Sequence, residues 1–255
     1  MAFSSHSTRQ RKCHCEKDKI NQGSILYHIL NHERHLPSCS CSCESKEKVM
    51  LESPYVTCKA ASEVLLKTVN FIKNLPSFHG LLQQDQFLLL ENCWAPLFVL
   101  GLAQEGVDFE VTEPKTSILK EILMNQKSRN YHEKMCSQLS AAEVQKVKSF
   151  LTKCWSIDIS TKEYVYLKGI ILFTPDVSGL GSPQYILCLQ QEAELALTDY
   201  IHSLHPQDKT RFSQILFALT SLKTINAHII TELFFRPLIG NVQMNALLME
   251  MLYAS

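Results

Sequence analysis

Glycine is scarce in this sequence, with eight residues among 255, and neither sign of charge is in excess. The chain contains no glycine-rich phosphate-binding loop and no G-x-S-x-G nucleophile motif, so it lacks the local patterns of nucleotide-binding proteins and serine hydrolases. Lys and Arg together number 25, as do Asp and Glu. This balance does not favour a nucleic-acid binder, because such proteins usually show a basic excess.

A long uninterrupted hydrophobic run is also missing. The most apolar stretch, residues 87–103, contains Glu91, Asn92 and Pro96. It therefore falls short of the roughly 20 clean residues that a membrane span needs. The first residues have no apolar core of the kind found in signal peptides. We expect a protein of the nucleus or cytosol without a membrane partner, in which the ten cysteines stay reduced.

Residues 1–50 differ in composition from the rest of the chain. They are rich in Ser, Lys, His and Cys, with one apolar island at Ile25–Leu30. This composition predicts a mostly disordered arm with one short helix, followed by a folded domain over residues 51–255. The cysteines of the arm form C-x-C pairs, whereas structural zinc sites normally use C-x₂₋₄-C spacing. We therefore predict no metal site, and a zinc-dependent enzyme or adaptor is kept as an alternative.

From about Thr57 onward, apolar residues recur at the helical spacings of three and four. The first such stripe consists of Ala61, Val64, Leu65, Thr68, Val69 and Ile72. Ser160-Thr-Lys-Glu163 is a capping box, which predicts a helix running to Phe173. Two more long helices are expected at Gln184–His202 and Phe212–Ile225.

The remaining patterns decide the fold class. Only Val107–Val111 is typical of a strand. Residues 125–137 are polar, which predicts a break between helices. With one strand among many helical stripes, the sequence predicts an all-α domain of roughly nine to eleven helices.

Two short segments, residues 24–30 and 117–123, share the template S-I-L-x-x-I-L. In each, the serine can act as the N-cap, and three apolar side chains follow at positions i, i+3 and i+4. These are Leu26, Ile29 and Leu30 in the first copy and Leu119, Ile122 and Leu123 in the second. Such a narrow stripe suits a helix that lies in a groove of another protein. We favour this role for the copy in the arm, and a place in the core for the second copy.

The segment Phe71–Leu90 resembles the signature of the nuclear receptor ligand-binding domain. Its matching residues are Phe71, Lys73, Phe78, Leu81, Asp85, Gln86, Leu89 and Leu90. Further similarity is found in Glu163–Ile170, in Arg211–Ile225 and in the terminal LLMEML of residues 247–252. The resemblance implies an all-α, three-layer antiparallel helical sandwich with a small β element.

In that family, a partner's short amphipathic helix lies in a groove between two charged residues. The resemblance assigns this charge clamp to Lys73 and Glu250, whose charges oppose the partial charges at the ends of the bound helix. The groove positions that it implies are Val69, Gln86, Phe87, Leu90, Leu247 and Met251. Phe87 departs from the smaller aliphatic residue that is usual there, and would narrow or fill the groove. Asp85 has a structural role in the family rather than a catalytic one.

The resemblance extends to orphan receptors of the family that lack the zinc-finger DNA-binding domain. It implies a transcriptional corepressor, nuclear and in part cytoplasmic, that is no enzyme, needs no cofactor and contacts no DNA directly. Its expected partners are the ligand-binding domains of other nuclear receptors, bound through the two S-I-L-x-x-I-L segments, together with corepressor proteins and a second copy of the chain. The alternative is a receptor that senses an apolar small molecule, since the fold commonly encloses an apolar pocket.

Overall fold

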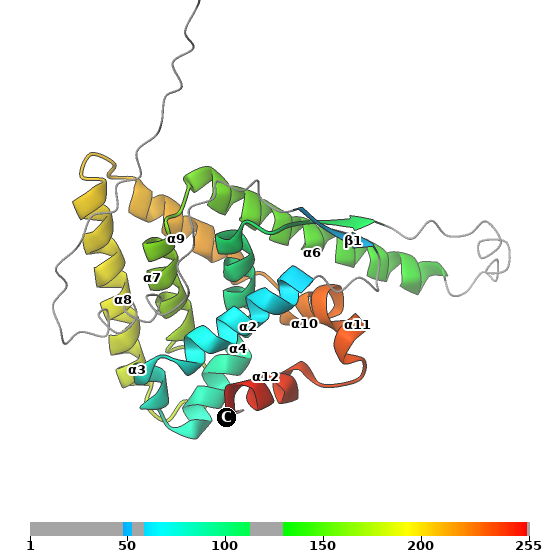
Figure 1. Ribbon diagram of the computed structural model, residues 1–255, viewed down its shortest axis with the longest axis horizontal. Coiled ribbons are helices and arrows are strands. Elements are labelled where there is room, and N and C mark those ends of the chain that lie inside the picture. The colour runs from blue at the N-terminus through cyan, green and yellow to red at the C-terminus, as the bar shows by residue number, and fades with distance from the viewer. Residues whose placement is uncertain (1–47, 53–58, 113–129, 254–255) are drawn as a thin grey trace, which may run out of the picture.

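The computed structural model describes residues 48–52, 59–112 and 130–253 (Figure 1). Its longer helices are α2 (Lys59–Lys73), α4 (Gln83–Glu105), α6 (Asn130–Ile157), α7 (Thr161–Leu172), α8 (Pro183–Leu204), α9 (Arg211–Leu222) and α12 (Met244–Tyr253). Short helical segments are α3 (Pro76–His79), α10 (Ala227–Ile230), the π-helix η2 (Thr231–Phe235) and α11 (Arg236–Ile239). Residues 1–47 of the predicted arm and both S-I-L-x-x-I-L segments lie outside the described residues.

Helix α4 runs through the centre of the domain, and the other helices pack around it (Figure 1). Helices α2 and α12 lie against α4 and against each other. Helices α6 and α7 also contact α4, while α8 packs on α7 and α9 packs on α6 and α8. This arrangement confirms the predicted all-α helical sandwich.

Helix α4 is continuous although Pro96 lies inside it. Proline has no N–H, so the carbonyl of Asn92 loses its helical partner, but Asn92 is exposed and water can bond to that carbonyl. By length and composition α4 could cross a membrane, but 72% of its apolar window is buried inside the domain. Glu91 and Asn92, which interrupt the apolar run in the sequence, lie on the exposed side of this core helix.

The local signals for α7 and its neighbours predicted these helices well. Ser160 is the N-cap of α7: its hydroxyl accepts a hydrogen bond from the Glu163 N–H at 3.3 Å, and its own N–H donates to the Glu163 carboxylate at 2.7 Å. The predicted helices at 184–202 and 212–225 correspond to α8 and α9, with ends that differ by one to three residues.

Two features differ from the expectation. The predicted polar break at 125–137 is wrong from residue 130 onward, because α6 begins at Asn130. Residues such as Glu133, Lys134 and Met135 have high helix propensity, which a search for apolar periodicity does not register. The predicted strand is present as β2 (Asp108–Thr112), but it pairs in parallel with an unpredicted strand, β1 (Lys48–Glu52).

A buried ion pair between Glu163 and Arg211 joins three helices. The Glu163 side chain is fully buried, and both of its oxygens accept hydrogen bonds from the Arg211 guanidinium at 2.7 Å. The same guanidinium donates to the carbonyls of Ile157 and Asp158 at 3.2 and 3.0 Å. Burial raises the pKa of Glu163, but hydrogen bonds from Arg211 and Ser160 outweigh it and hold the pKa below its ordinary value. The start of α9 is thereby fixed to the end of α6 and the start of α7.

Glu163→Gln should lower the free energy of unfolding at pH 7 by roughly 3–5 kcal/mol, because it leaves a buried guanidinium without its counter-charge. Since folding lowers the pKa of Glu163, the ionised carboxylate stabilises the fold above its unfolded pKa of about 4.3. That contribution is lost as the pH falls through the lower folded pKa. Urea unfolding of both proteins at several pH values should therefore show a difference that narrows below about pH 4.

Glu105→Gln is the matched control for this experiment. Glu105 pairs with Lys67 at the surface, where the two side chains are 35% and 53% exposed. An exposed pair contributes roughly 0–1 kcal/mol, so this variant should unfold almost as the wild type does. Equal losses in the two variants would contradict the importance of the buried pair.

Candidate functional site

The signature segment forms a compact turn between α2 and α4. Helix α2 ends at Lys73, the chain passes through α3, and α4 begins at Gln83. Leu75, Phe78 and Leu81 point into the core from this turn and are at most 7% exposed. The His79 ring contacts the carbonyl of Lys73. The last residue of α2 and the first residue of α4 are therefore held at a fixed separation, and the two helices form one continuous surface.

Asp85 anchors the first turn of α4 to the start of α8. Its side chain is fully buried, and its two oxygens accept hydrogen bonds from the backbone N–H groups of Gly181 at 2.7 Å and Ser182 at 3.1 Å. A Cβ on Gly181 would lie 2.9 Å from Leu82 Cδ1, but that atom ends an exposed side chain that can move aside, so the approach does not strictly require glycine. These contacts satisfy the charge of Asp85 and give it a structural role.

Helix α12 covers part of the surface formed by α2 and α4 (Figure 1). Its buried face consists of Met244, Leu248 and Leu252, at 7%, 1% and 3% exposure. These residues are spaced by four, so they form one stripe along the helix. The stripe packs into the main hydrophobic core.

Two side-chain hydrogen bonds fix the direction of α12. Near its start, the Asn245 amide donates to the Glu91 carboxylate. At its end, the Tyr253 hydroxyl donates to Gln86 Oε1 at 3.2 Å. The Gln86 amide nitrogen in turn donates to the carbonyl of Leu81 at 3.0 Å. Helix α12 therefore runs antiparallel to the first half of α4.

The predicted groove positions are gathered around this contact. Val69 on α2 and Leu90 on α4 are 2% and 1% exposed, and Gln86 is 8% exposed. The other predicted residues on these three helices, Lys73, Phe87, Leu247 and Met251, are partly buried, and Glu250 is exposed. Because α12 bonds to Gln86 and Glu91 and lies against α2, its apolar face occupies the surface that the predicted positions on α2 and α4 form. The roles of Asn245, Tyr253 and Glu91 were not predicted. The four-residue spacing of Met244, Leu248 and Leu252 is the sequence signal that could have predicted the buried face of α12.

The interior beside α4 is filled by aromatic rings. Phe98 lies 5.2 Å from Phe234 and 5.1 Å from Phe235, measured between ring centroids, in edge-to-face contacts. Phe109 lies 5.1 Å from Phe234, and Trp94 lies 6.2 Å from Phe235. The π-helix η2 supplies the two adjacent phenylalanines, both of which are buried. These five residues, here called the aromatic cluster, pack α4, β2 and η2 together.

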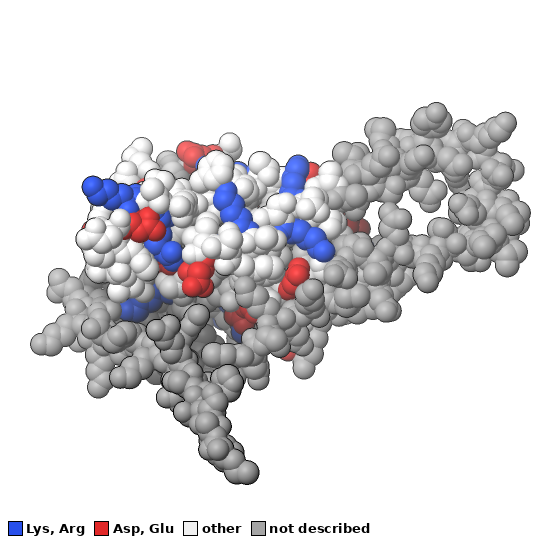
Figure 2. All heavy atoms as spheres, turned by 90° about the horizontal axis from the view of Figure 1, so that it is seen from above, with Lys and Arg blue, Asp and Glu red and all other residues white. Residues whose placement is uncertain are grey.

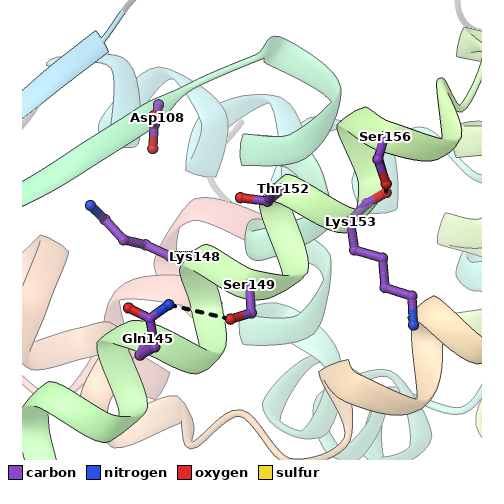
Figure 3. A pocket seen from close by; sticks show the side chains of 7 residues that line it. All are labelled: Asp108, Gln145, Lys148, Ser149, Thr152, Lys153 and Ser156. Atoms are coloured by element: carbon purple, nitrogen blue, oxygen red, sulfur yellow. Dashed lines mark hydrogen bonds between the residues drawn. The ribbon is translucent and has the colours of Figure 1, made fainter.

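A polar hollow of about 540 Å³, open to solvent, lies between β2 and α6 (Figure 3). It is lined by Asp108, Gln145, Lys148, Ser149, Thr152, Lys153 and Ser156. Its two lysines diverge: Lys148 Nζ lies 5.7 Å from the Phe109 ring, whereas Lys153 Nζ points to α9 and lies 3.6 Å from the Phe217 ring. The charges do not converge on one point, so the hollow has no focused binding geometry.

Comparison with known proteins defines the class. The sequence matches the family described as the ligand-binding domain of nuclear hormone receptor over residues 53–239. The chain therefore belongs to the nuclear hormone receptor family. This membership makes it a regulator of transcription with a mainly nuclear location, in a class of regulatory proteins rather than enzymes.

Three similar relatives are members of one subfamily. Nuclear receptor subfamily 0 group B member 2 of Rattus norvegicus is 42% identical over 256 residues, which cover 96% of this chain and 98% of that protein. The Homo sapiens member 2 is 42% identical over 247 residues, covering 94% and 96%. Member 1 of Callithrix jacchus is 40% identical over 269 residues, and the match covers 95% of this chain but only 57% of that longer protein.

Phe98→Ala should lower the free energy of unfolding by roughly 3–5 kcal/mol, because it removes a fully buried ring from the aromatic cluster and leaves a cavity. Chemical denaturation measures this change. Phe217→Ala is the control, since Phe217 is 65% exposed and its removal should cost little. A small loss for Phe98→Ala would mean that the cluster is loosely packed and can rearrange around a cavity.

Proposed function

We propose that this chain is a transcriptional corepressor that acts by protein contact, without binding DNA directly. The observation that supports this most is the position of α12. Its apolar stripe lies on the α2–α4 surface, where the family binds the helices of activating partners. A receptor domain whose groove is occupied by its own last helix is poorly prepared to recruit activators. It is better suited to bind other receptors and to offer a surface to corepressor proteins.

The surface charge supports the absence of direct DNA binding. The net charge is zero, and basic and acidic side chains are interspersed on the face shown in Figure 2. A duplex-binding surface would be expected to gather lysines and arginines without acidic neighbours.

Contact with other receptors is assigned to the two S-I-L-x-x-I-L segments. Leu26, Ile29 and Leu30 would enter the groove of another receptor's ligand-binding domain, and Leu119, Ile122 and Leu123 would form a second such helix. The physical basis is the stripe of three apolar side chains at i, i+3 and i+4, which is too narrow to bury itself.

Leu26→Ala combined with Leu30→Ala should weaken binding to receptor ligand-binding domains at least about tenfold, because two buried anchors are lost. Fluorescence titration against a panel of such domains measures this effect. The matched control is Tyr27→Ala with His28→Ala, which changes only the spacer positions and should retain affinity. If the anchor variant binds every receptor within about twofold of the wild type, the segment is not the receptor ligand.

The charge clamp remains part of the proposal for the state in which α12 moves from the groove to its rim and a partner's helix takes its place. Lys73 at the end of α2 would face the carbonyl end of that helix, and Glu250 its N–H end. The groove around that helix would be lined by Val69, Gln86, Phe87, Leu90, Leu247 and Met251. Repressive cofactors are the partners that we assign to this groove, and the bulk of Phe87 would restrict which helices fit.

Lys73→Ala and Glu250→Ala should each weaken a bound cofactor helix by roughly 0.3–1 kcal/mol. Melting of Glu250→Ala should change little, since an exposed charge contributes below about 1 kcal/mol to stability. Titration of one labelled cofactor peptide against both variants tests this expectation. Glu192→Ala, an exposed carboxylate on α8, is the control and should bind normally. If neither variant differs from the control, cofactors dock elsewhere.

Three finer points complete the proposal. The protein has no catalytic activity of its own. A fraction of its molecules resides in the cytoplasm. Association with a second copy is assigned to α9, on which Phe217 is 65% exposed.

An apolar small-molecule ligand is the alternative function, but the aromatic cluster occupies the space between α4, β2 and η2. A rise in melting temperature with an apolar ligand would favour that alternative.

A further inference from the structure

The connector between α11 and α12, residues 240–243, is held by one side chain. Arg236 Nη1 donates to the carbonyl of Gly240 at 2.6 Å and to that of Val242 at 3.3 Å. Arg236 Nε donates to Glu232 Oε1 at 2.9 Å, one turn earlier in η2. One guanidinium therefore bridges the π-helix and both ends of the turn that leads into α12.

The turn itself depends on a glycine. Gly240 has φ +55° and ψ −123°, a conformation that residues with a side chain rarely adopt. A Cβ at this position would meet no atom within 4 Å, so the requirement comes from the backbone and not from lack of space. The Gly240 N–H donates to the carbonyl of Arg236 at 2.9 Å, which closes the turn.

Burial does not explain the path of the connector. Leu238 and Val242 are 60% and 50% exposed, although both are apolar. Figure 1 shows the connector swinging outward from α11 before it returns to α12 beneath α2 and α4. With little apolar packing in this segment, hydrogen bonds select its path: those of the Arg236 side chain, the Gly240 N–H bond, and the bond from the Val242 N–H to the carbonyl of Ile239 at 3.0 Å. Met244, the first buried residue of α12, follows Val242 by only two positions.

We propose that Arg236 is a positioning residue that keeps α12 on the α2–α4 surface. Glu232 orients the guanidinium, the guanidinium holds the two carbonyls of the connector, and the reversal at Gly240 directs α12 back across α4. When these hydrogen bonds are broken, α12 leaves its place on the surface more often, and a partner's helix can enter. This inference rests on the proposed function, because it assigns control of the same groove.

The test uses the full chain and four variants. Arg236→Ala removes the bridge, Arg236→Lys keeps the charge but not the planar fork, and Gly240→Ala opposes the turn. Lys223→Ala removes an exposed charge at the end of α9 and is the control. Hydrogen exchange of the α12 amides reports the position of the helix without any partner, and a short labelled peptide with one L-x-x-L-L segment reports access to the groove.

We expect amide exchange in α12 to rise about tenfold in Arg236→Ala and Gly240→Ala, with α7 and α8 unchanged. The increase should be smaller in Arg236→Lys and absent in Lys223→Ala. The peptide should bind several-fold more tightly to Arg236→Ala and Gly240→Ala than to the wild type, because a larger fraction of these molecules has a free groove.

The failures of the two hypotheses are distinguishable. Unchanged exchange in α12 of Arg236→Ala and Gly240→Ala overturns the positioning role, whatever the peptide does. Faster exchange throughout the domain also overturns it, since Arg236 would then support the whole fold. Faster exchange confined to α12, without peptide binding, supports the positioning role and contradicts the proposed use of the groove.

Discussion

The geometry of the candidate site depends on the buried carboxylate of Asp85. A charge removed from water is costly unless donors surround it, and the N–H groups of Gly181 and Ser182 supply that compensation. This contact fixes the first turn of α4 to the start of α8, which lies almost a hundred residues further along the chain. Gln86, Phe87, Leu90 and Glu91 follow on that turn and the next, so their positions are set by the same anchor.

Helix α12 is bound to this scaffold by interactions of unequal strength. Each fully buried side chain of its stripe contributes roughly 1.5–3 kcal/mol, whereas hydrogen bonds at exposed positions such as Glu91 contribute little net free energy. Burial therefore provides the affinity of α12, and the polar contacts at Asn245, Tyr253 and Arg236 choose its orientation. A helix bound in this way can be displaced by a competitor with a better apolar stripe.

The aromatic cluster and the Glu163–Arg211 pair stabilise the two remaining sides of the domain. The cluster joins α4 to β2 and η2. The ion pair joins α6, α7 and α9 on the other side. The cluster and the ion pair thus fix elements other than α2 and α12.

Sequence alone determined the features that have local causes. The capping box at Ser160 and Glu163 predicted the start of α7, because both partners lie within one helical turn. Apolar periodicity predicted α2, α8 and α9, and the signature residues from Phe71 to Leu90 identified the family. Each of these signals depends on neighbours a few positions apart, which a sequence displays directly.

Only the tertiary structure decided the rest. The parallel pairing of β1 with β2 joins segments about sixty residues apart, and no local pattern specifies it. The four-residue spacing of Met244, Leu248 and Leu252 could have shown which face of α12 would be buried, but not against which surface. That choice depends on the relative free energies of burying Met244, Leu248 and Leu252 at different places, and on whether Arg236 can hold the preceding turn. Such competition between distant surfaces exists only once the chain has folded.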